Sequence, residues 1–210
     1  MANDSDEPPF MTFISTEGSH AILGRLDLPD ATDGIEQPVY FAETGMIYQN
    51  VPIYKNKESV GGLAVVDPAK RTLVSMILVD GCQPAGNAHG PGTQLLLGCK
   101  AGSPASKMPA QSLIVDVATG KVVKTINQVG GSDEVWYNPG NQTYYLAARD
   151  NPGGPVLGMI DAAKNEWVAN IPTAKNSHSV SAVPASNQIY VPMLPNDSCK
   201  NGCVAVYGAK

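Results

Sequence analysis

Apolar and polar residues alternate along this chain in short runs, and the runs recur every 45 to 52 residues. The clearest copies are GGLAVVDPAKRTLVSMIL, QSLIVDVATGKVVKTI and PVLGMIDAAKNEWVANI. Each copy is an apolar run that ends in an aspartate, then a polar turn, then a second apolar run. The three aspartates, Asp67, Asp116 and Asp161, are 49 and 45 residues apart. Alternation and β-branched content predict strands, and no stretch sustains the 3.6-residue period of a helix.

Two further runs complete each repeat. An inner run precedes a Pro/Gly turn, as in EQPVYFAETG, QPAGNAHGPG, SDEVWYNPGN and SHSVSAVPASN, and a second run follows the turn at once. About four strands in a period of this length is typical of a β-propeller, whose four-stranded sheets surround a central channel.

The aspartate-type strand has two degenerate copies, PFMTFIST and CVAVYG, which place Ser15 and Tyr207 where the aspartate stands. The chain therefore has five copies of this strand and four of each other strand. We predict an all-β fold, a β-propeller of about four four-stranded blades with one surplus strand. It would form a four-bladed ring, part of a larger propeller, or half of a ring that a homodimer completes. We expect a disordered tail over residues 1–8 and one propeller domain over 9–210, with repeats at 9–58, 59–108, 109–153 and 154–210.

The segments VVDPAKRTLV, IVDVATGKVVKTI and IDAAKNEWV, with VYFAETGMIY and VWYNPGNQTYYLA, resemble the YVTN-type β-propeller repeat family. That family is related at fold level to the gluconolactonase/senescence-marker-protein superfamily. The resemblance runs from about Pro9 to the end of the chain and implies a propeller fold, with about seven blades in typical members. Gluconolactonase-type enzymes use a Glu, Asn and Asp set around a cation, which Glu36 and Asp133 would imitate in part. An activity taken from this resemblance is a fold-level analogy.

Composition narrows the class of partner. The net charge is −5, the pI is about 5.1 and no basic run occurs, which argues against nucleic acid as a partner. No apolar run approaches the roughly 18 to 20 residues that cross a bilayer. Residues 1–8 are polar and acidic and do not form a signal peptide. A small molecule, a cation or a protein remains as the expected partner.

The four cysteines form two local groups. Cys82 and Cys99 bracket one predicted hairpin, and Cys199 and Cys203 flank the short loop KNG. Two local pairs predict disulfides and therefore a secreted or periplasmic protein. The alternative is four free buried thiols. A zinc site is disfavoured because neither pair has CxxC spacing.

The residues just before each inner strand of a propeller line one mouth of the central channel, where positions from different blades converge. Alignment on the turn residues gives the following sets. The positions predicted at one level are Gln37, Ala85, Asp133 and His178; one step before them are Glu36, Pro84, Ser132 and Ser177, and one step after them are Pro38, Gly86, Glu134 and Ser179.

Carboxylates and an imidazole therefore gather at the predicted mouth. Glu36, Asp133 and His178 are the candidate catalytic residues and the candidate ligands of one divalent cation, Ca²⁺ or Zn²⁺. We expect four further polar side chains to contact a ligand: Gln37, Glu134, Ser177 and Ser179. The alternative is that these polar groups only hydrate the end of the channel.

A serine hydrolase is disfavoured because neighbouring residues of a strand point to opposite faces, so neither Ser177 nor Ser179 is expected to face His178. No G-x-S-x-G motif is present. The repeated aspartates are expected to accept hydrogen bonds in turns and to have no catalytic part. The sequence thus predicts an extracytoplasmic propeller that binds a small ligand, metal or partner at the mouth. The alternative is a metal-assisted hydrolase of lactonase or esterase type that uses the same pocket.

Overall fold

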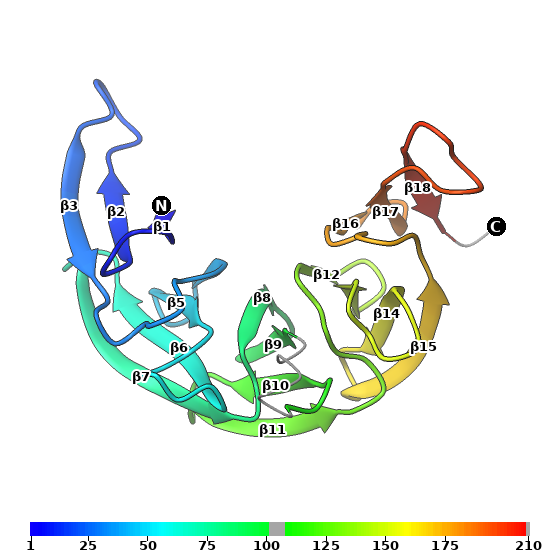
Figure 1. Ribbon diagram of the computed structural model, residues 1–210. Coiled ribbons are helices and arrows are strands. Elements are labelled where there is room, and N and C mark those ends of the chain that lie inside the picture. The colour runs from blue at the N-terminus through cyan, green and yellow to red at the C-terminus, as the bar shows by residue number, and fades with distance from the viewer. Residues whose placement is uncertain (101–107, 209–210) are drawn as a thin grey trace. The chain divides into compact units, whose positions relative to one another are not determined.

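The computed structural model describes residues 1–100 and 108–208 (Figure 1). Its described residues contain eighteen strands and no helix, which confirms the all-β prediction. The chain divides into two compact units, Met1–Pro84 and Ala85–Lys210, where we expected one domain. Each unit is described by itself. Parts of the predicted repeats 59–108 and 154–210, at residues 101–107 and 209–210, lie outside the described residues.

The first unit contains two antiparallel sheets, one of three strands and one of four. The strands of the first sheet, in spatial order, are β1 (Ala2–Asn3), β2 (Phe10–Ile14) and β3 (Ile22–Asp27). Those of the second sheet are β4 (Pro38–Phe41), β5 (Met46–Val51), β6 (Val60–Asp67) and β7 (Thr72–Asp80).

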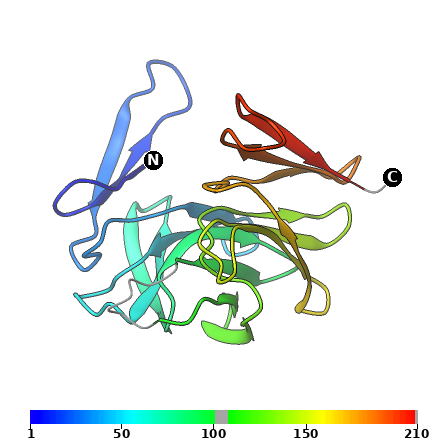
Figure 2. The same ribbon diagram turned by 45° about the vertical axis from the view of Figure 1, so that its right-hand side comes forward.

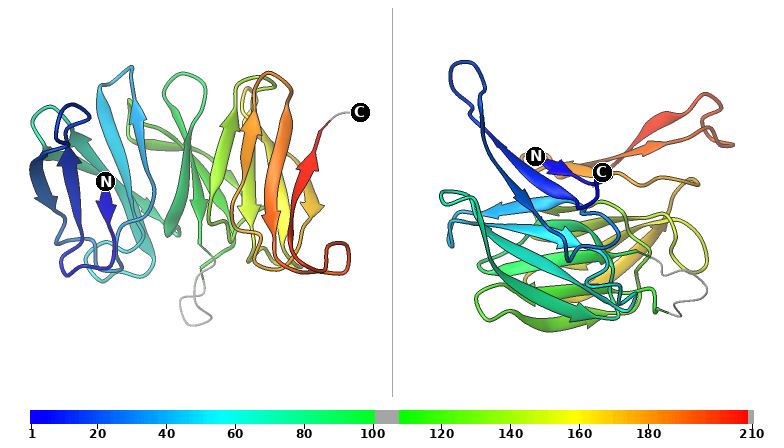
Figure 3. Two further views of the ribbon diagram at one scale, coloured as in Figure 1. Left: turned by 90° about the horizontal axis from the view of Figure 1, so that it is seen from above. Right: turned by 60° about the vertical axis from the view of Figure 1, so that its left-hand side comes forward.

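The second unit contains three antiparallel sheets. The first is formed by β8 (Pro84–His89), β9 (Gln94–Cys99), β10 (Ser112–Asp116) and β11 (Lys121–Ile126). The next is formed by β12 (Val135–Asn138), β13 (Thr143–Ala148), β14 (Val156–Asp161) and β15 (Glu166–Pro172). The last has three strands, β16 (Ser181–Val183), β17 (Gln188–Met193) and β18 (Cys203–Tyr207), and stands beside β12–β15 in the views of Figure 3.

The described residues therefore form five sheets and not four blades, and each sheet is open. The count was wrong because β2–β3 and β16–β18, which together were counted as one blade and one surplus strand, belong to two separate sheets. Residues 1–8 also differ from the expected disorder. Ala2 pairs with Met11, Asn3 pairs with Phe10, and Asn3 Nδ2 donates to Thr12 Oγ1 at 3.0 Å. Backbone pairing thus orders a segment whose side chains show no strand pattern.

The repeated aspartates confirm their predicted role in turns. Asp67 Oδ1 accepts from the backbone N–H groups of Ala69 and Lys70 at 2.9 and 3.0 Å. Asp161 makes the same pair of bonds, and Asp116 accepts from the Ala118 N–H. The Lys70 N–H, first among several donors, holds the pKa of the Asp67 carboxyl below its ordinary value.

The aspartate-type strand pairs with the outer strand that follows it in the same way in each sheet. In the four sheets that have an outer strand, the register shifts at a bulge one residue before the turn position, for example between Met159 and Ile160, ahead of Asp161. Strand pairing therefore defines equivalent positions. Ile189 faces Tyr207 as Tyr144 faces Ile160, so Gly208 is equivalent to Asp161. The assignment of Tyr207 to the aspartate position was wrong by one residue.

Successive sheets within each unit bury apolar side chains against one another. In the first unit, Met11 and Leu28 pack with Ala64 and Val66. In the second unit, one cluster joins β8–β11 to β12–β15 around the fully buried Tyr144. Another cluster joins β12–β15 to β16–β18. These clusters hold the inner strands β12 and β16 next to each other.

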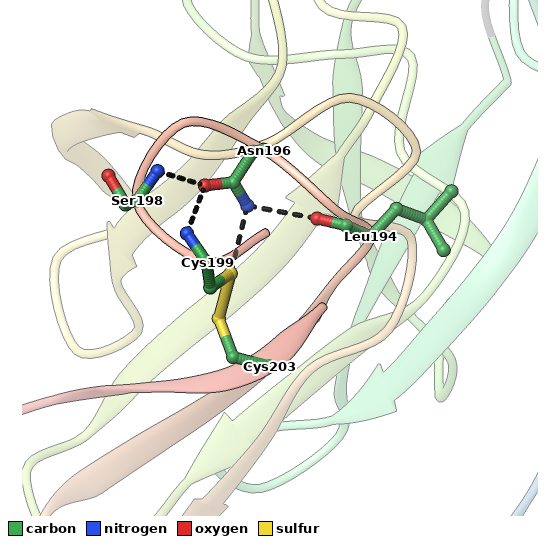
Figure 4. The surroundings of a disulfide bond; sticks show 5 residues. All are labelled: Leu194, Asn196, Ser198, Cys199 and Cys203. Carbon is green, nitrogen blue, oxygen red and sulfur yellow. Dashed lines mark hydrogen bonds between the residues drawn. A yellow bond between two sulfur atoms is a disulfide. The ribbon is translucent and has the colours of Figure 1, made fainter. Parts of the chain in front are cut away.

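All four cysteines are in disulfides, which confirms that prediction. Cys199 and Cys203 are bonded to each other, with their Cα atoms 6.1 Å apart (Figure 4). Asn196 organises the same loop: its Oδ1 accepts from the N–H groups of Ser198 and Cys199, and its Nδ2 donates to Leu194 O. Disulfides are typical of an oxidising compartment. Among the described residues there is no helix long and apolar enough to cross a bilayer.

Candidate binding rim

Five polar residues of the second unit lie at one end of the inner strands. Asp133 and Glu134 directly precede β12, Arg149 directly follows β13, and His178 and Ser179 precede β16. Because β12 and β13 are antiparallel, the start of β12 lies beside the end of β13, which brings Arg149 to Asp133. We call these five residues the rim cluster.

Backbone hydrogen bonds fix this segment on both sides. The Asp133 N–H donates to Ala147 O at 3.2 Å, and the Ala147 N–H donates to Glu134 O at 2.9 Å. The Glu134 N–H donates to His178 O at 3.1 Å, a bond that passes from one sheet to the next. The rim cluster is therefore held by main-chain contacts that do not depend on its side chains.

The Asp133 carboxylate is the centre of the cluster. Its Oδ2 lies 3.0 Å from Arg149 Nη1 and 3.5 Å from His178 Nδ1. Arg149 Nε also lies 3.4 Å from Asp150 Oδ2. The side chain of Asp133 is 22% exposed, against 37% for Arg149 and 50% for His178. The carboxylate thus orients a guanidinium and an imidazole that both remain accessible to a ligand.

Glycine at position 86 allows the rim to form. A Cβ at Gly86 in β8 would overlap Asp133 O and come within 2.8 Å of Val135 N. The backbone of β8 therefore passes directly against the segment that carries Asp133. Gly86 was aligned with Glu134 in the sequence, but in the structure it makes room for the neighbouring backbone.

The geometry of His178 does not form a hydrolytic triad. Ser179 Oγ lies 3.5 Å from His178 Nδ1, although we expected neither neighbouring serine to approach the imidazole. Asp133 Oδ2 faces the same nitrogen. A Ser-His-Asp triad needs the carboxylate and the hydroxyl on different ring nitrogens. Asp133 can therefore orient His178, but Ser179 is not positioned as a nucleophile that His178 activates.

Ser177 lies away from the rim surface. Its side chain is buried, with 1% relative exposure, and its Oγ has no hydrogen-bond partner among the described residues. Ser132, one residue before Asp133, is buried in the same way. Both serines lie next to partly exposed rim residues but turn their own hydroxyls into the packing. A ligand at the rim would contact Ser179 and not Ser177.

Glu36 and Gln37 lie in the first unit, before β4. The Glu36 N–H donates to Asn50 O and the Asn50 N–H donates to Gln37 O, at 3.0 and 3.2 Å. This pattern matches that of Asp133, Glu134 and Ala147, so the residue equivalent to Asp133 is Glu36. The alignment that placed Gln37 level with Asp133 was wrong by one residue. The first hairpin turn has Ala42 where the others have proline, and proline had guided the alignment.

Arg149 is the member of the cluster that the sequence did not indicate. Its position directly after the second strand of the sheet was readable from the alternation. Its side chain could have been paired with Asp133 only from the register of β12 and β13.

No group of three or more His, Cys, Asp or Glu side chains within residues 1–100 and 108–208 is placed to hold a metal ion.

The fold is that of an all-β protein built from antiparallel, mostly four-stranded sheets. It is similar to propeller-type folds. A chain of the Kuenenia stuttgartiensis hydrazine synthase matches with a TM-score of 0.74 and 18% identity, over 95% of this chain and 56% of that one. A chain of a mitotic checkpoint complex matches with a TM-score of 0.70 and 12% identity, over 99% and 59%. The chain thus spans a little over half the length of each. No protein-family model and no curated protein matches the sequence.

Proposed function

We propose that this chain is an extracytoplasmic binding module that holds a small polyhydroxylated molecule, such as a sugar or sugar acid, at the rim cluster. The observation that carries the proposal is the convergence of Arg149 and His178 on one carboxylate oxygen of Asp133, while all three side chains remain partly exposed. Hydroxyl groups both donate and accept, and the rim offers both kinds of partner.

An exposed aromatic side chain supports this ligand class. Trp136 lies in β12, two residues from Glu134, so alternation places both on the same side of the strand. It is 42% exposed. Small-molecule sites combine apolar surface with directional hydrogen bonds, and Trp136 adds exposed apolar surface on the Glu134 side of β12.

Titration calorimetry with D-gluconate and D-glucose, each up to about 10 mM, tests the proposal. We expect binding of at least one sugar, and a loss of about tenfold or more in affinity in Arg149→Met, because hydrogen bonds to a charged group contribute about 1.5 kcal/mol or more. Arg25→Met is the matched control, since Arg25 also pairs with an aspartate, Asp27, but lies in the first unit. Equal binding by the two variants, or no binding of either sugar, would contradict the proposal.

The alternative function, a metal-assisted hydrolase of lactonase or esterase type, is favoured by the carboxylate-oriented imidazole, which is suited to act as a general base. Asp133 and His178 would then carry the chemistry, with Ca²⁺ or Zn²⁺ as the cation. Hydrolysis of glucono-δ-lactone with and without each ion, in the wild type and in His178→Gln, tests it. A rate equal to the uncatalysed rate under all conditions would exclude this activity for that lactone.

A further inference from the structure

In the second unit, the sheet β16–β18 leaves one face open, whereas the equivalent face of β12–β15 packs against β16–β18. Register assigns the residues of this face. The open face, which we call the β18 face, is formed by Val183, Tyr190, Pro192, Val204 and Val206; their equivalents in β12–β15 are Asn138, Tyr145, Ala147, Leu157 and Met159.

Exposure separates the two sets. Val204 is 58% exposed and its equivalent Leu157 is 1% exposed, because Leu157 packs into the cluster shared with β16–β18. Val183 is 42% exposed, whereas Asn138 is fully buried and donates to Asn187 of the next sheet. The β18 face therefore has the apolar residues of a packing face, and no sheet formed by the described residues of the second unit lies over it (Figure 2).

The first unit also has an open face, on the sheet β1–β3. It corresponds to the side of β12–β15 that packs against the preceding sheet, β8–β11. Ile14 in β2 is equivalent to Val66 and Ile160, which face the preceding sheet in their clusters and are 0% exposed. Ile14 is 40% exposed, and Ile22, which pairs with it, is 73% exposed. We call this surface, formed by Ile14 and Ile22 with the Arg25-covered ring of Phe10 at its edge, the β2 face.

We infer that the β18 face of one copy packs against the β2 face of a second copy, so that the chains associate head to tail. Within the units, three apolar clusters already join a face of the β18 kind to a face of the β2 kind. Equivalent positions at the two open faces carry exposed apolar side chains, among them Ile14 at 40% and Val206 at 54%. An association of this kind is heterologous, because the two contacting surfaces differ.

Two lysine substitutions test the arrangement by complementation, with the full disulfide-bonded chain in light scattering after gel filtration. The wild type should exceed the chain mass of 22.0 kDa as concentration rises. Ile14→Lys disables only the β2 face and Val206→Lys only the β18 face, so each should remain monomeric, with self-association weakened at least about tenfold. An equimolar mixture retains one intact face on each variant and should form a dimer. Val123→Lys, at a residue 50% exposed on outer strand β11, should associate as the wild type does.

Several outcomes would overturn the inference. A wild type that remains at 22.0 kDa up to about 1 mM would show that a second copy does not cover these faces. Closure within one chain, or covering by a different protein, would give that same result. Association that persists in Val206→Lys, or a mixture that stays monomeric while the wild type associates, would assign self-association to another surface. Circular dichroism confirms that each variant is folded, and Val204→Glu repeats the test if Val206→Lys is not.

Discussion

Gly90 is the position at which the packing between the sheets β8–β11 and β12–β15 can be tested most sharply. It follows β8 and lies against the buried ring of Tyr144 in β13, the sheet that carries Asp133 and Arg149. A Cβ at Gly90 would overlap Tyr144 Oη and Cζ and lie 2.9 Å from Cε1. The ring is fully buried, so Gly90→Ala must displace it or the strand beside it.

The expected cost follows from two opposing effects. Overpacking a close-packed core costs about 1–3 kcal/mol. Replacing glycine by alanine at a compatible backbone returns about 0.4–1 kcal/mol through the unfolded chain, and no positive φ at Gly90 prevents alanine there. We therefore expect Gly90→Ala to lower the free energy of unfolding by about 1–2 kcal/mol.

Urea unfolding followed by tryptophan fluorescence measures this change. Gly208→Ala is the matched control in the same unit, because a Cβ there meets its nearest atom at 3.6 Å, an ordinary contact. We expect that variant to remain within about 0.5 kcal/mol of the wild type.

A double-mutant cycle identifies the cause. The Tyr144 hydroxyl has no hydrogen-bond partner among the described residues, and burial raises its pKa. Tyr144→Phe should therefore be close to neutral or stabilising. Without the hydroxyl, Gly90→Ala should cost less, with a coupling energy of at least about 0.5 kcal/mol. If Gly90→Ala is tolerated as well as Gly208→Ala, or its cost is unchanged in Tyr144→Phe, the reasoning is refuted.

Three further predictions concern the turns, the disulfide and the rim. Several groups, the Lys164 N–H first among them, lower the pKa of the Asp161 carboxyl in the folded protein. The charged carboxylate therefore stabilises the fold above the unfolded pKa of 3.8, and this stabilisation is lost as pH falls through the lower folded value. Asp161→Asn should thus destabilise at pH 7 and lose that effect near pH 2 in urea titrations. Replacing Cys199 and Cys203 by serine opens a loop of separation 4 and should cost about 2 kcal/mol, measured by calorimetry without reductant. Asp133→Asn should change stability by less than about 1 kcal/mol, because its ion pairs are partly exposed, and a larger loss would assign the rim a structural role.

Local patterns explain why most of the fold could be predicted. A strand side chain alternates between faces, and an aspartate at the end of a strand can accept from the next N–H groups, so Asp67 and Asp161 were readable without tertiary information. Strand β1 was not readable, since it is only Ala2 and Asn3 and joins β2 through backbone bonds. Such pairing leaves no signal in side-chain polarity.

The rim could be predicted only in part for a related reason. The sequence indicated Asp133, Glu134 and His178 because they precede inner strands. It did not indicate Arg149, whose contact depends on the reach of a long side chain across the register of β12 and β13. The one-residue error at Gln37 has the same origin, because hydrogen-bond register is set by pairing between strands and the first turn lacks the proline that marks the others.

The corrected register explains how a rim of this kind can vary while the fold stays the same. Glu36 and Asp133 occupy one equivalent position, and His178 precedes Val183 by the same five residues that separate Asp133 from Asn138. At Glu36 and Asp133 the main chain makes the same bond, from the residue N–H to a carbonyl of the second strand. Since that bond does not involve the side chain, the residue type is left to the ligand. The turn aspartates have no such freedom, because their carboxylates themselves hold the backbone. Substitutions at the rim should therefore change what is bound, and substitutions at the turns should change only stability.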